Sequence, residues 1–257
     1  MKARLQHTVL VIDVGNTSTS LGLYRAGKVL RSARVGTRVR DVGRLSAAVR
    51  RLAKRKALAA AVLSSVVPAV NPLWKKALRR VRPRIRLLSV SHRMRLGVPV
   101  TYPRPATIGA DRLANACGAA ARYGTPVIVA DFGTAVTFDV ILRGKGYVGG
   151  VIAPGLPLMF SYLAEKTALL PRIGPGPVRH AVGKSTAEAM RMGAVWGYRG
   201  LVREIVRELK QGLKLPRLKL CATGGYADWV LRGSGLRMPV DRDLTLRGLG
   251  RIYELNS

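Results

Sequence analysis

The chain has 257 residues, a hydrophobic fraction of 48% and a formal net charge of +32 at neutral pH. Its length suits one large domain or two of modest size, and its apolar content excludes a disordered chain. Two distant cysteines, Cys117 and Cys221, exclude a disulfide framework and argue against a zinc site, so we expect both to be buried packing residues.

Apolar runs and helical periodicity divide the first half into alternating elements. Leu45, Val49 and Leu52 recur on one face of a helix whose other face carries arginines, and Trp74 and Leu78 should point inward from a later helix. The expected strands are 8–14, 20–24, 28–35, 59–66 and 85–90, and the expected helices are 41–56, one beginning at Pro68, and 107–122.

The second half repeats this pattern and predicts an α/β fold there too. We expect strands at 126–131, 135–142, 146–151 and 218–223, helices at 154–169, 186–213 and 244–255, and a Pro/Gly loop at 171–177. We expect helix 107–122 to bridge the two halves. A cleft between two α/β halves is the natural place for a ligand.

Two polar turns follow buried strands, one in each half. The first is Asp13-Val14-Gly15-Asn16-Thr17, and the second is Asp131-Phe132-Gly133-Thr134. Glycine allows close approach of a ligand, turn amides and hydroxyls can donate to phosphate oxygens, and a carboxylate can hold a cation. Either turn alone is equally well explained as a hairpin whose Asp and Asn cap the bend. Together they suggest a phosphate clamp made of two similar halves.

This duplication resembles the nucleotide-binding core of the sugar kinase, actin and heat-shock ATPase superfamily. In that superfamily ATP lies between two related domains. The P-loop pattern Gly-x-x-x-x-Gly-Lys-Ser/Thr is absent, and the Gly-x-Gly-x-x-Gly at 144–149 leads into an expected strand and does not open a helix. Walker-type and Rossmann nucleotide sites are therefore disfavoured.

Six short motifs in order make the resemblance more specific. They are Asp13 to Thr17, Tyr102-Pro103 before Gly109-Ala110-Asp111-Arg112, Asp131 to Thr137, Gly149 to Gly155, Gly183 to Thr186, and Thr223-Gly224-Gly225. With these motifs the chain resembles the type III pantothenate kinases nearly end to end. The resemblance implies two related domains of the ribonuclease H-like, actin-like ATPase type, 1–106 and 107–257, with the active site in the cleft between them.

The resemblance implies that the chain phosphorylates pantothenate with ATP, in the first step of coenzyme A synthesis. The first turn suits a cradle for the β- and γ-phosphates, with Thr134 contacting nucleotide phosphate from the other side. Asp13 would face Mg²⁺ through water, because Mg²⁺ keeps several waters. The residues expected at ATP are Asp13, Val14, Gly15, Asn16, Thr17, Ser18, Thr19, Ser20 and Thr134.

Two further carboxylates take their roles from the resemblance. Asp131 would help to hold a monovalent cation, K⁺ or NH₄⁺, although a hairpin cap is the alternative. Asp111 would be the catalytic base that accepts the proton of the pantothenate hydroxyl, a role that typically accelerates a reaction about 10²- to 10⁴-fold. Its alternative role is that of a carboxylate stabilising the first turn of a helix.

The remaining substrate contacts surround Asp111. Arg112 can bind the pantothenate carboxylate through two parallel bonds, or form a structural salt bridge instead. The expected substrate-binding residues are Tyr102, Gly109, Ala110, Asp111, Arg112 and Thr186. Family members are homodimers, so we expect a homodimer here.

The strong positive charge is not needed by a kinase. Between Asp13 and Asp111 the only acid is Asp41, so this interval attracts polyanions. One explanation of this charge is that the basic residues lie on solvated helix faces. The other is an alternative function, in which the chain is a nucleic-acid-associated accessory regulator on a kinase-like fold. We expect nucleic-acid binding to be non-specific and electrostatic. A kinase for another small hydroxylated acid or sugar is a third possibility.

The start of the chain, residues 1–7, is basic, but the apolar stretch that follows is interrupted by Asp13 and Asn16. That stretch is too short for a signal-peptide core or a membrane span. We therefore expect a soluble, cytoplasmic protein with no membrane partner.

Overall fold

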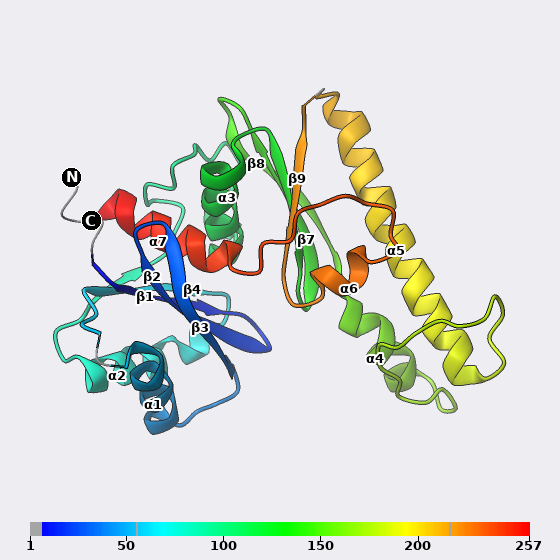
Figure 1. The fold of residues 1–257 in the computed structure, drawn as a ribbon, viewed down its shortest axis with the longest axis horizontal. Helices are drawn as coiled ribbons and strands as arrows, with labels where there is room; N and C mark the ends of the chain where they lie inside the picture. The colour runs from blue at the N-terminus through cyan, green and yellow to red at the C-terminus, as the bar shows by residue number, and fades with distance from the viewer. Residues whose placement is uncertain (1–6, 55, 216) are drawn as a thin grey trace. The chain divides into compact units, whose positions relative to one another are not determined.

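The computed structural model describes residues 7–54, 56–215 and 217–257, so most of the basic start weighed above lies outside the described residues. Strands and helices alternate along the chain (Figure 1). In order they are β1 (Val9–Val14), β2 (Ser18–Arg25), β3 (Lys28–Gly36), α1 (Val42–Ala53), β4 (Ala60–Ser65), η2 (Pro68–Val70), α2 (Asn71–Val81), β5 (Arg86–Ser89), η3 (Pro105–Thr107), α3 (Ala110–Tyr123), β6 (Val127–Phe132), β7 (Ala135–Leu142), β8 (Gly146–Pro154), α4 (Leu156–Lys166), α5 (Thr186–Leu213), β9 (Lys219–Thr223), α6 (Ala227–Leu231) and α7 (Leu244–Asn256).

The strands form two sheets. The first has the order β3-β2-β1-β4-β5, with β1, β2 and β3 antiparallel and β1, β4 and β5 parallel. The second has the order β8-β7-β6-β9. The α/β class expected from the sequence is confirmed. In each sheet a strand that ends in a carboxylate motif, β1 or β6, lies beside the strand that follows it, as expected for a hairpin.

One face of the first sheet is covered by α1 and α2. Leu45 and Val49 of α1, and Trp74 and Leu78 of α2, join Ile12 of β1 in one buried cluster. The inward faces predicted for these helices are therefore confirmed. Asp41 begins α1, where its carboxylate accepts hydrogen bonds from the amides of Gly43 and Arg44. Such a cap is typically worth about 1 kcal/mol.

The other face of the first sheet is covered by α7. Gly22 of β2 lies under Leu246, and Gly250 leaves the space that the Tyr24 ring fills. The Tyr24 hydroxyl donates a 2.8 Å hydrogen bond to Glu254. This helix in turn packs on α3, where a side chain at Gly248 would strike the α3 backbone. The sheet is therefore sandwiched between two pairs of helices, with α3 outermost on the α7 side.

The chain groups into two compact units. Unit 1 comprises Met1–Val127, Val140–Gly149 and Asp243–Ser257, and unit 2 comprises Ile128–Asp139 and Gly150–Arg242. Both α3 and α7 belong to unit 1 in this grouping. The division into halves at residue 107 stays a prediction.

The expected elements are present, with differences at their ends. The helix expected from 107 begins at Ala110 after a 3-10 turn, and α4 ends at Lys166, before 169. Sequence reasoning missed α6, because five residues are too few to show a helical period. Cys117 and Cys221 are free and buried as expected, and burial raises the pKa of each thiol to about 12.

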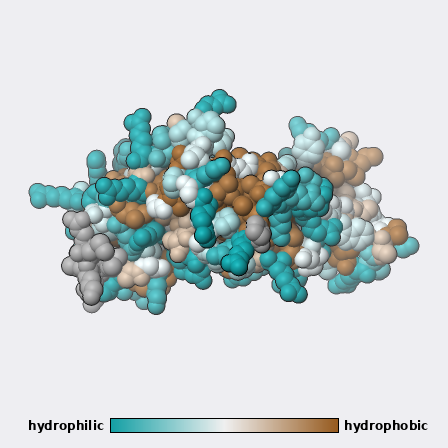
Figure 2. All heavy atoms as spheres, turned by 90° about the horizontal axis from the view of Figure 1, so that it is seen from above, coloured by the Kyte–Doolittle hydropathy of each residue, from teal (hydrophilic) through white to brown (hydrophobic). Residues whose placement is uncertain are grey.

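The surface view in Figure 2 shows hydrophilic side chains projecting over much of the visible face, with hydrophobic residues between them. Within the part of the chain that the structure describes, no helix combines the length and the apolar character needed to cross a bilayer.

Candidate active site

The turn between β1 and β2 is held by its own backbone and by Thr37. The amide of Gly15 donates to the carbonyl oxygen of Ser18 at 3.1 Å, and the hydroxyl of Thr37 donates to the carbonyl oxygen of Gly15 at 2.7 Å. Asn16 and Thr17 are exposed at the tip. The turn is thus a rigid loop whose tip presents an amide and a hydroxyl side chain to solvent.

Asp13 lies in a row of polar side chains on one face of the first sheet. It is paired with Ser20 on β2 and with Ser64 on β4, and directly paired residues share a face. The hydroxyl of Ser64 donates a 2.9 Å hydrogen bond to Oδ1 of Asp13. The carboxylate is therefore oriented by its neighbour and flanked by a second hydroxyl.

The other residues predicted to bind the phosphates of ATP differ in how accessible their side chains are. Val14 is buried in the core, so only its backbone is available to a ligand. Thr19 is fully buried, and its hydroxyl is hydrogen-bonded to that of Thr37 at 3.0 Å. Ser18 and Ser20 are half-buried on the face that carries Asp13. The hydroxyls best placed for phosphate are those of Thr17, Ser18 and Ser20.

Asp111 lies in the first turn of α3, close to the end of β4. A side chain at Gly109 would collide with Oδ1 of Asp111 and would contact Val66, which lies just beyond β4. The amide of Val66 donates to the carbonyl oxygen of Val14 at 3.0 Å. Asp111 therefore lies at the edge of the sheet where β1 and β4 end, which is also the edge that carries Asp13.

The environment of Asp111 suits a group that must take up a proton. Burial raises the pKa of its carboxyl above the ordinary value, and the amide and guanidinium of Arg112 oppose that shift. The amide of Arg112 donates to Oδ1 at 2.8 Å. A carboxylate of raised pKa is a better base than one in water. Ala110 begins the helix beside it.

Tyr102 and Arg112, both predicted to bind substrate, meet at Tyr147. The rings of Tyr102 and Tyr147 are edge-to-face with centroids 6.2 Å apart, and the guanidinium carbon of Arg112 lies 5.8 Å from the Tyr147 centroid. Gly149, with a φ of +132°, lies against the Tyr102 ring. Tyr147 is almost fully buried, whereas Tyr102 is 36% exposed. The two predicted contact residues thus share one buried aromatic support.

The second turn, in unit 2, brings Asp131 against Gly224. A side chain at Gly224 would meet Oδ1 of Asp131 at 2.6 Å and the carbonyl oxygen of Phe132 at 2.5 Å. Gly224 has a φ of +92°, which favours glycine. The motif Thr223-Gly224-Gly225 therefore lies beside the carboxylate of the second turn and leaves two oxygen atoms close together.

Thr134 and Thr186 also lie in unit 2. The carbonyl oxygen of Thr134 accepts a 3.1 Å hydrogen bond from the amide of Gly155, which fixes the turn. Thr186 is the first residue of α5 and is exposed. Its helix is capped by Ser185, whose Oγ accepts from the amide of Glu188, and the Glu188 carboxylate accepts from the amide of Lys184, just before the cap.

Three residues of the site were missed by sequence reasoning. Ser64 and Thr37 are polar residues in or after strands, where a lone hydroxyl gives little signal. The parallel pairing of β1 with β4 gives Ser64 its role. From the sequence alone, Tyr147 looks like an ordinary aromatic residue of the core. It meets Tyr102 because residues 99–101 pair with the start of β8.

The described residues contain no group of three or more His, Cys, Asp or Glu side chains that could hold a metal ion. A single carboxylate flanked by hydroxyls instead suits Mg²⁺, which commonly takes one or two carboxylates together with water and substrate phosphates.

Comparisons with known proteins identify the fold. The chain resembles ethanolamine utilization protein EutJ from Carboxydothermus hydrogenoformans, with a TM-score of 0.56, 14% identity and coverage of 95% of this chain and 90% of that one. It also resembles a ROK family glucokinase from Streptomyces griseus in complex with glucose and AMPPNP, with a TM-score of 0.53, 18% identity and coverage of 97% and 99%. The predicted actin-like ATPase and sugar kinase fold is confirmed.

Sequence comparisons are more specific. The type III pantothenate kinase from Akkermansia muciniphila is 52% identical over 197 residues, which are 77% of this chain and 79% of the relative. That of Methylacidiphilum infernorum is 37% identical over 248 residues, 96% of this chain and 88% of the relative. The sequence model of the family matches residues 9–208. The resemblance found from six short motifs is thereby confirmed, and the chain belongs to the type III pantothenate kinase family.

Proposed function

We propose that this chain transfers the γ-phosphoryl group of ATP to the hydroxyl of pantothenate, giving 4'-phosphopantothenate and ADP in the first step of coenzyme A synthesis. The observation that carries the proposal is that Asp111, a carboxyl of raised pKa, lies at the same sheet edge as Asp13 and its turn. A base and a phosphate cradle at one edge are the two parts that this reaction requires.

In the reaction, Asp111 takes the proton of the pantothenate hydroxyl as that oxygen bonds to the γ-phosphorus. The bond from the γ-phosphorus to the oxygen bridging to ADP breaks, and ADP leaves with that electron pair. Because phosphoryl transfer has a loose transition state, the protein acts mainly by positioning the reactants and offsetting charge.

The nucleotide phosphates would be held by the two turns. In the first, Gly15 and Asn16 offer backbone and amide groups, and Thr17, Ser18 and Ser20 offer hydroxyls. Asp13 would hold Mg²⁺ through water, and bound Mg²⁺ would offset charge on the phosphates. Val14 and Thr19 support the turn from the core, and Thr134 would contact nucleotide phosphate from the second turn.

Asp131 would help to hold K⁺ or NH₄⁺. The proximity of its Oδ1 and the Phe132 carbonyl oxygen at Gly224 supports this, because such ions prefer oxygen ligands. A side chain in place of Gly224 would fill the space between these oxygens.

Pantothenate would bind around Asp111. Arg112, steadied on Tyr147, would pair with the substrate carboxylate, and Tyr102 would cover the substrate chain. Gly109 and Ala110 would line the approach to the base, and Thr186 would contribute a hydroxyl.

We also propose a cytoplasmic homodimer. Large apolar side chains are exposed on α4 and α5, including Leu158 at 42%, Tyr162 at 58% and Trp196 at 48%. Such side chains are commonly covered in an oligomer. Two free cysteines suit a reducing compartment.

The test is a coupled assay of ADP release with ATP and pantothenate, run with K⁺ and again with only Na⁺. Pantothenate-dependent turnover, identified as 4'-phosphopantothenate by mass spectrometry, is the expected result. Turnover with a different hydroxylated acid or sugar, and none with pantothenate, would reassign the substrate. Absence of turnover with all of them would favour a regulator on a kinase-like fold.

A further inference from the structure

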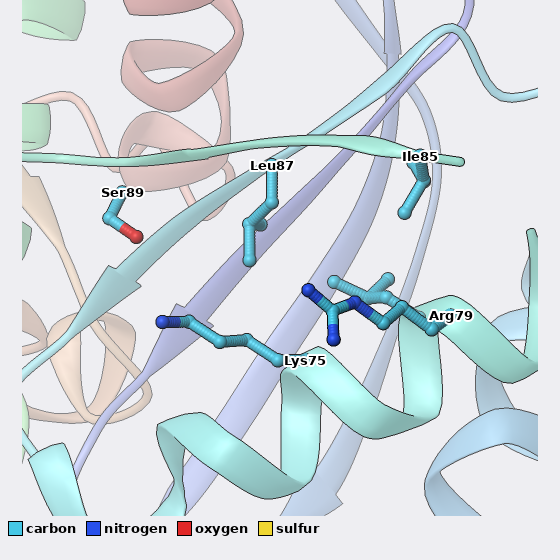
Figure 3. A pocket seen from close by; sticks show the side chains of 6 residues that line it. Lys75, Arg79, Ile85, Leu87 and Ser89 are labelled. Carbon is cyan, nitrogen blue, oxygen red and sulfur yellow. The ribbon is translucent and has the colours of Figure 1, made fainter. Parts of the chain in front are cut away.

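Two neighbouring hollows lie along α2, and Arg79 lines both. The first, of about 420 Å³, is lined by Val42, Lys76, Arg79 and Arg80. The second, of about 320 Å³, is lined by Lys75, Leu78, Arg79, Ile85, Leu87 and Ser89, and we call it the α2–β5 groove. Figure 3 shows Lys75 and Arg79 extending from the helix, and Ile85, Leu87 and Ser89 extending toward them from the strand.

The sequence of α2 builds this basic wall. Trp74, Ala77 and Leu78 are buried against the sheet, which leaves the four cations Lys75, Lys76, Arg79 and Arg80 exposed. These form two pairs spaced four residues apart, a rise of about 6 Å along the helix. The opposite wall is β5, the edge strand of the first sheet. The groove therefore runs along a helix and an open sheet edge.

Few acids accompany these charges, because Asp41, which caps α1 near Arg80, is the only acid between Asp13 and Asp111 in the sequence. Residues 42–110 contain no Asp or Glu and 16 Lys and Arg. Within the described ranges, none of the four α2 cations takes part in an ion pair. A surface of one sign attracts polyanions, and its condensed counterions are released when a phosphate chain replaces them.

The face lacks the features that two other partners require. A helix that lies in a membrane surface exposes Trp, Phe or Leu beside its cations. The large apolar residues exposed in the described chain include none from α1, α2 or β5. Proteins that read unpaired bases commonly stack them on exposed aromatic side chains. Trp74, the aromatic residue of α2, is buried.

We propose that the α2–β5 groove and the adjoining hollow bind the phosphodiester backbone of single-stranded nucleic acid without reading its sequence. Lys75 and Arg79 contact successive phosphates, and the Ser89 hydroxyl donates to a phosphate oxygen from the opposite wall. The helix α2 covers the face of the sheet opposite Asp13, which lies on the α7 face. Binding is therefore compatible with turnover at the kinase site.

The test measures binding of a fluorescein-labelled single-stranded RNA 20-mer of mixed sequence across a salt series. The groove variant carries Lys75→Gln and Arg79→Gln. The matched control carries Arg203→Gln and Lys210→Gln, which remove the same charge from the exposed side of α5. Pantothenate kinase turnover and thermal stability are measured on all three proteins.

In the groove variant, the slope of log K for RNA binding against log salt concentration should become shallower by about 1.4. Each lost phosphate contact with a single strand reduces the magnitude of that slope by about 0.7. The control should keep nearly the original slope, and all three proteins should keep their turnover. Equal losses in the groove and control variants would show diffuse attraction to the net charge and overturn the proposal. Unchanged RNA binding in the groove variant, or binding only to phosphatidylserine vesicles, would overturn it as well.

Discussion

The hydroxyl of Ser64 donates a 2.9 Å hydrogen bond to Oδ1 of Asp13, across the parallel pair of β1 and β4. Both side chains lie at the carboxyl ends of their strands, and Ser64 is fully buried. The bond holds the carboxylate in one orientation before any ligand arrives. At the proposed Mg²⁺ site such preorganisation would contribute directly to metal and nucleotide binding.

Ser64→Ala should weaken the response to Mg²⁺. Without the Ser64 donor, the Asp13 carboxylate is held less firmly, so the Mg²⁺ concentration at half-maximal turnover should rise severalfold. Loss of a hydrogen bond to a charged group should also lower the free energy of unfolding by about 1.5–3 kcal/mol.

The matched control is Ser46→Ala, which removes another buried hydroxyl, bonded to the carbonyl oxygens of Val42 and Ala77. It should lower stability without changing the Mg²⁺ dependence. An equal change in the Mg²⁺ dependence of both variants would assign the effect of Ser64 to stability alone.

Asp111→Asn should greatly reduce turnover while the protein stays folded and binds ATP. The amide keeps the shape of the carboxylate but cannot accept the proton, so turnover should fall by about 10²- to 10⁴-fold. Burial raises the pKa of Asp111, so in the wild type this group favours folding below its unfolded pKa and loses that contribution as pH rises through the folded pKa. The variant should therefore be as stable as the wild type at pH 7, or more stable.

Wild-type turnover should correspondingly fall on the acid side, as the pH drops through the raised pKa of Asp111. Calorimetry and a pH-rate profile measure both effects. Near wild-type turnover in Asp111→Asn would remove this residue from the mechanism. A fall in melting temperature together with turnover would support a capping role.

The sequence was informative where chemistry repeats in a local pattern. Asp13 to Thr17 and Asp131 to Thr134 predicted the turns, and the periodicity of Leu45, Val49, Trp74 and Leu78 predicted the faces that α1 and α2 bury. These signals are local, because a strand, a turn and an amphipathic helix are each encoded within about ten residues.

The residues that hold the predicted site residues in place could not be predicted from local patterns. Ser64 follows Asp13 by 51 residues and meets it through strand pairing. Tyr147 reaches Tyr102 because residues 99–101 pair with the start of β8. Such contacts depend on sheet register, which a single sequence does not reveal.

Tyr147→Leu should raise the KM for pantothenate more than it changes kcat. The ring supports both the Arg112 guanidinium and the Tyr102 ring, and such aromatic contacts are worth about 0.5–1.5 kcal/mol each. Loss of both should raise the KM about tenfold. Tyr147→Phe keeps the ring and should stay close to the wild type. An unchanged KM in a folded Tyr147→Leu variant would show that Arg112 and Tyr102 are positioned by other contacts.

Cys117 and Cys221 should resist thiol reagents in the folded protein. Burial raises the pKa of each thiol to about 12, so little reactive thiolate is present at pH 8. Titration with a disulfide reagent should count no thiols in native buffer and two in denaturant. Rapid reaction of either thiol in native buffer would show that its surroundings open easily.

Asp131→Ala should lower turnover and remove the response to added K⁺. The carboxylate and the Phe132 carbonyl oxygen crowd the same space at Gly224, and removal of the carboxylate takes away the charged member of this oxygen pair. The measurement is turnover against K⁺ concentration at constant ionic strength, in the wild type and the variant. Thr137→Val is the control, because it removes a hydroxyl on the next strand that donates to Asp139 at 3.3 Å. If K⁺ still activates Asp131→Ala with an unchanged half-saturation concentration, the ion is held elsewhere and Asp131 only caps its turn.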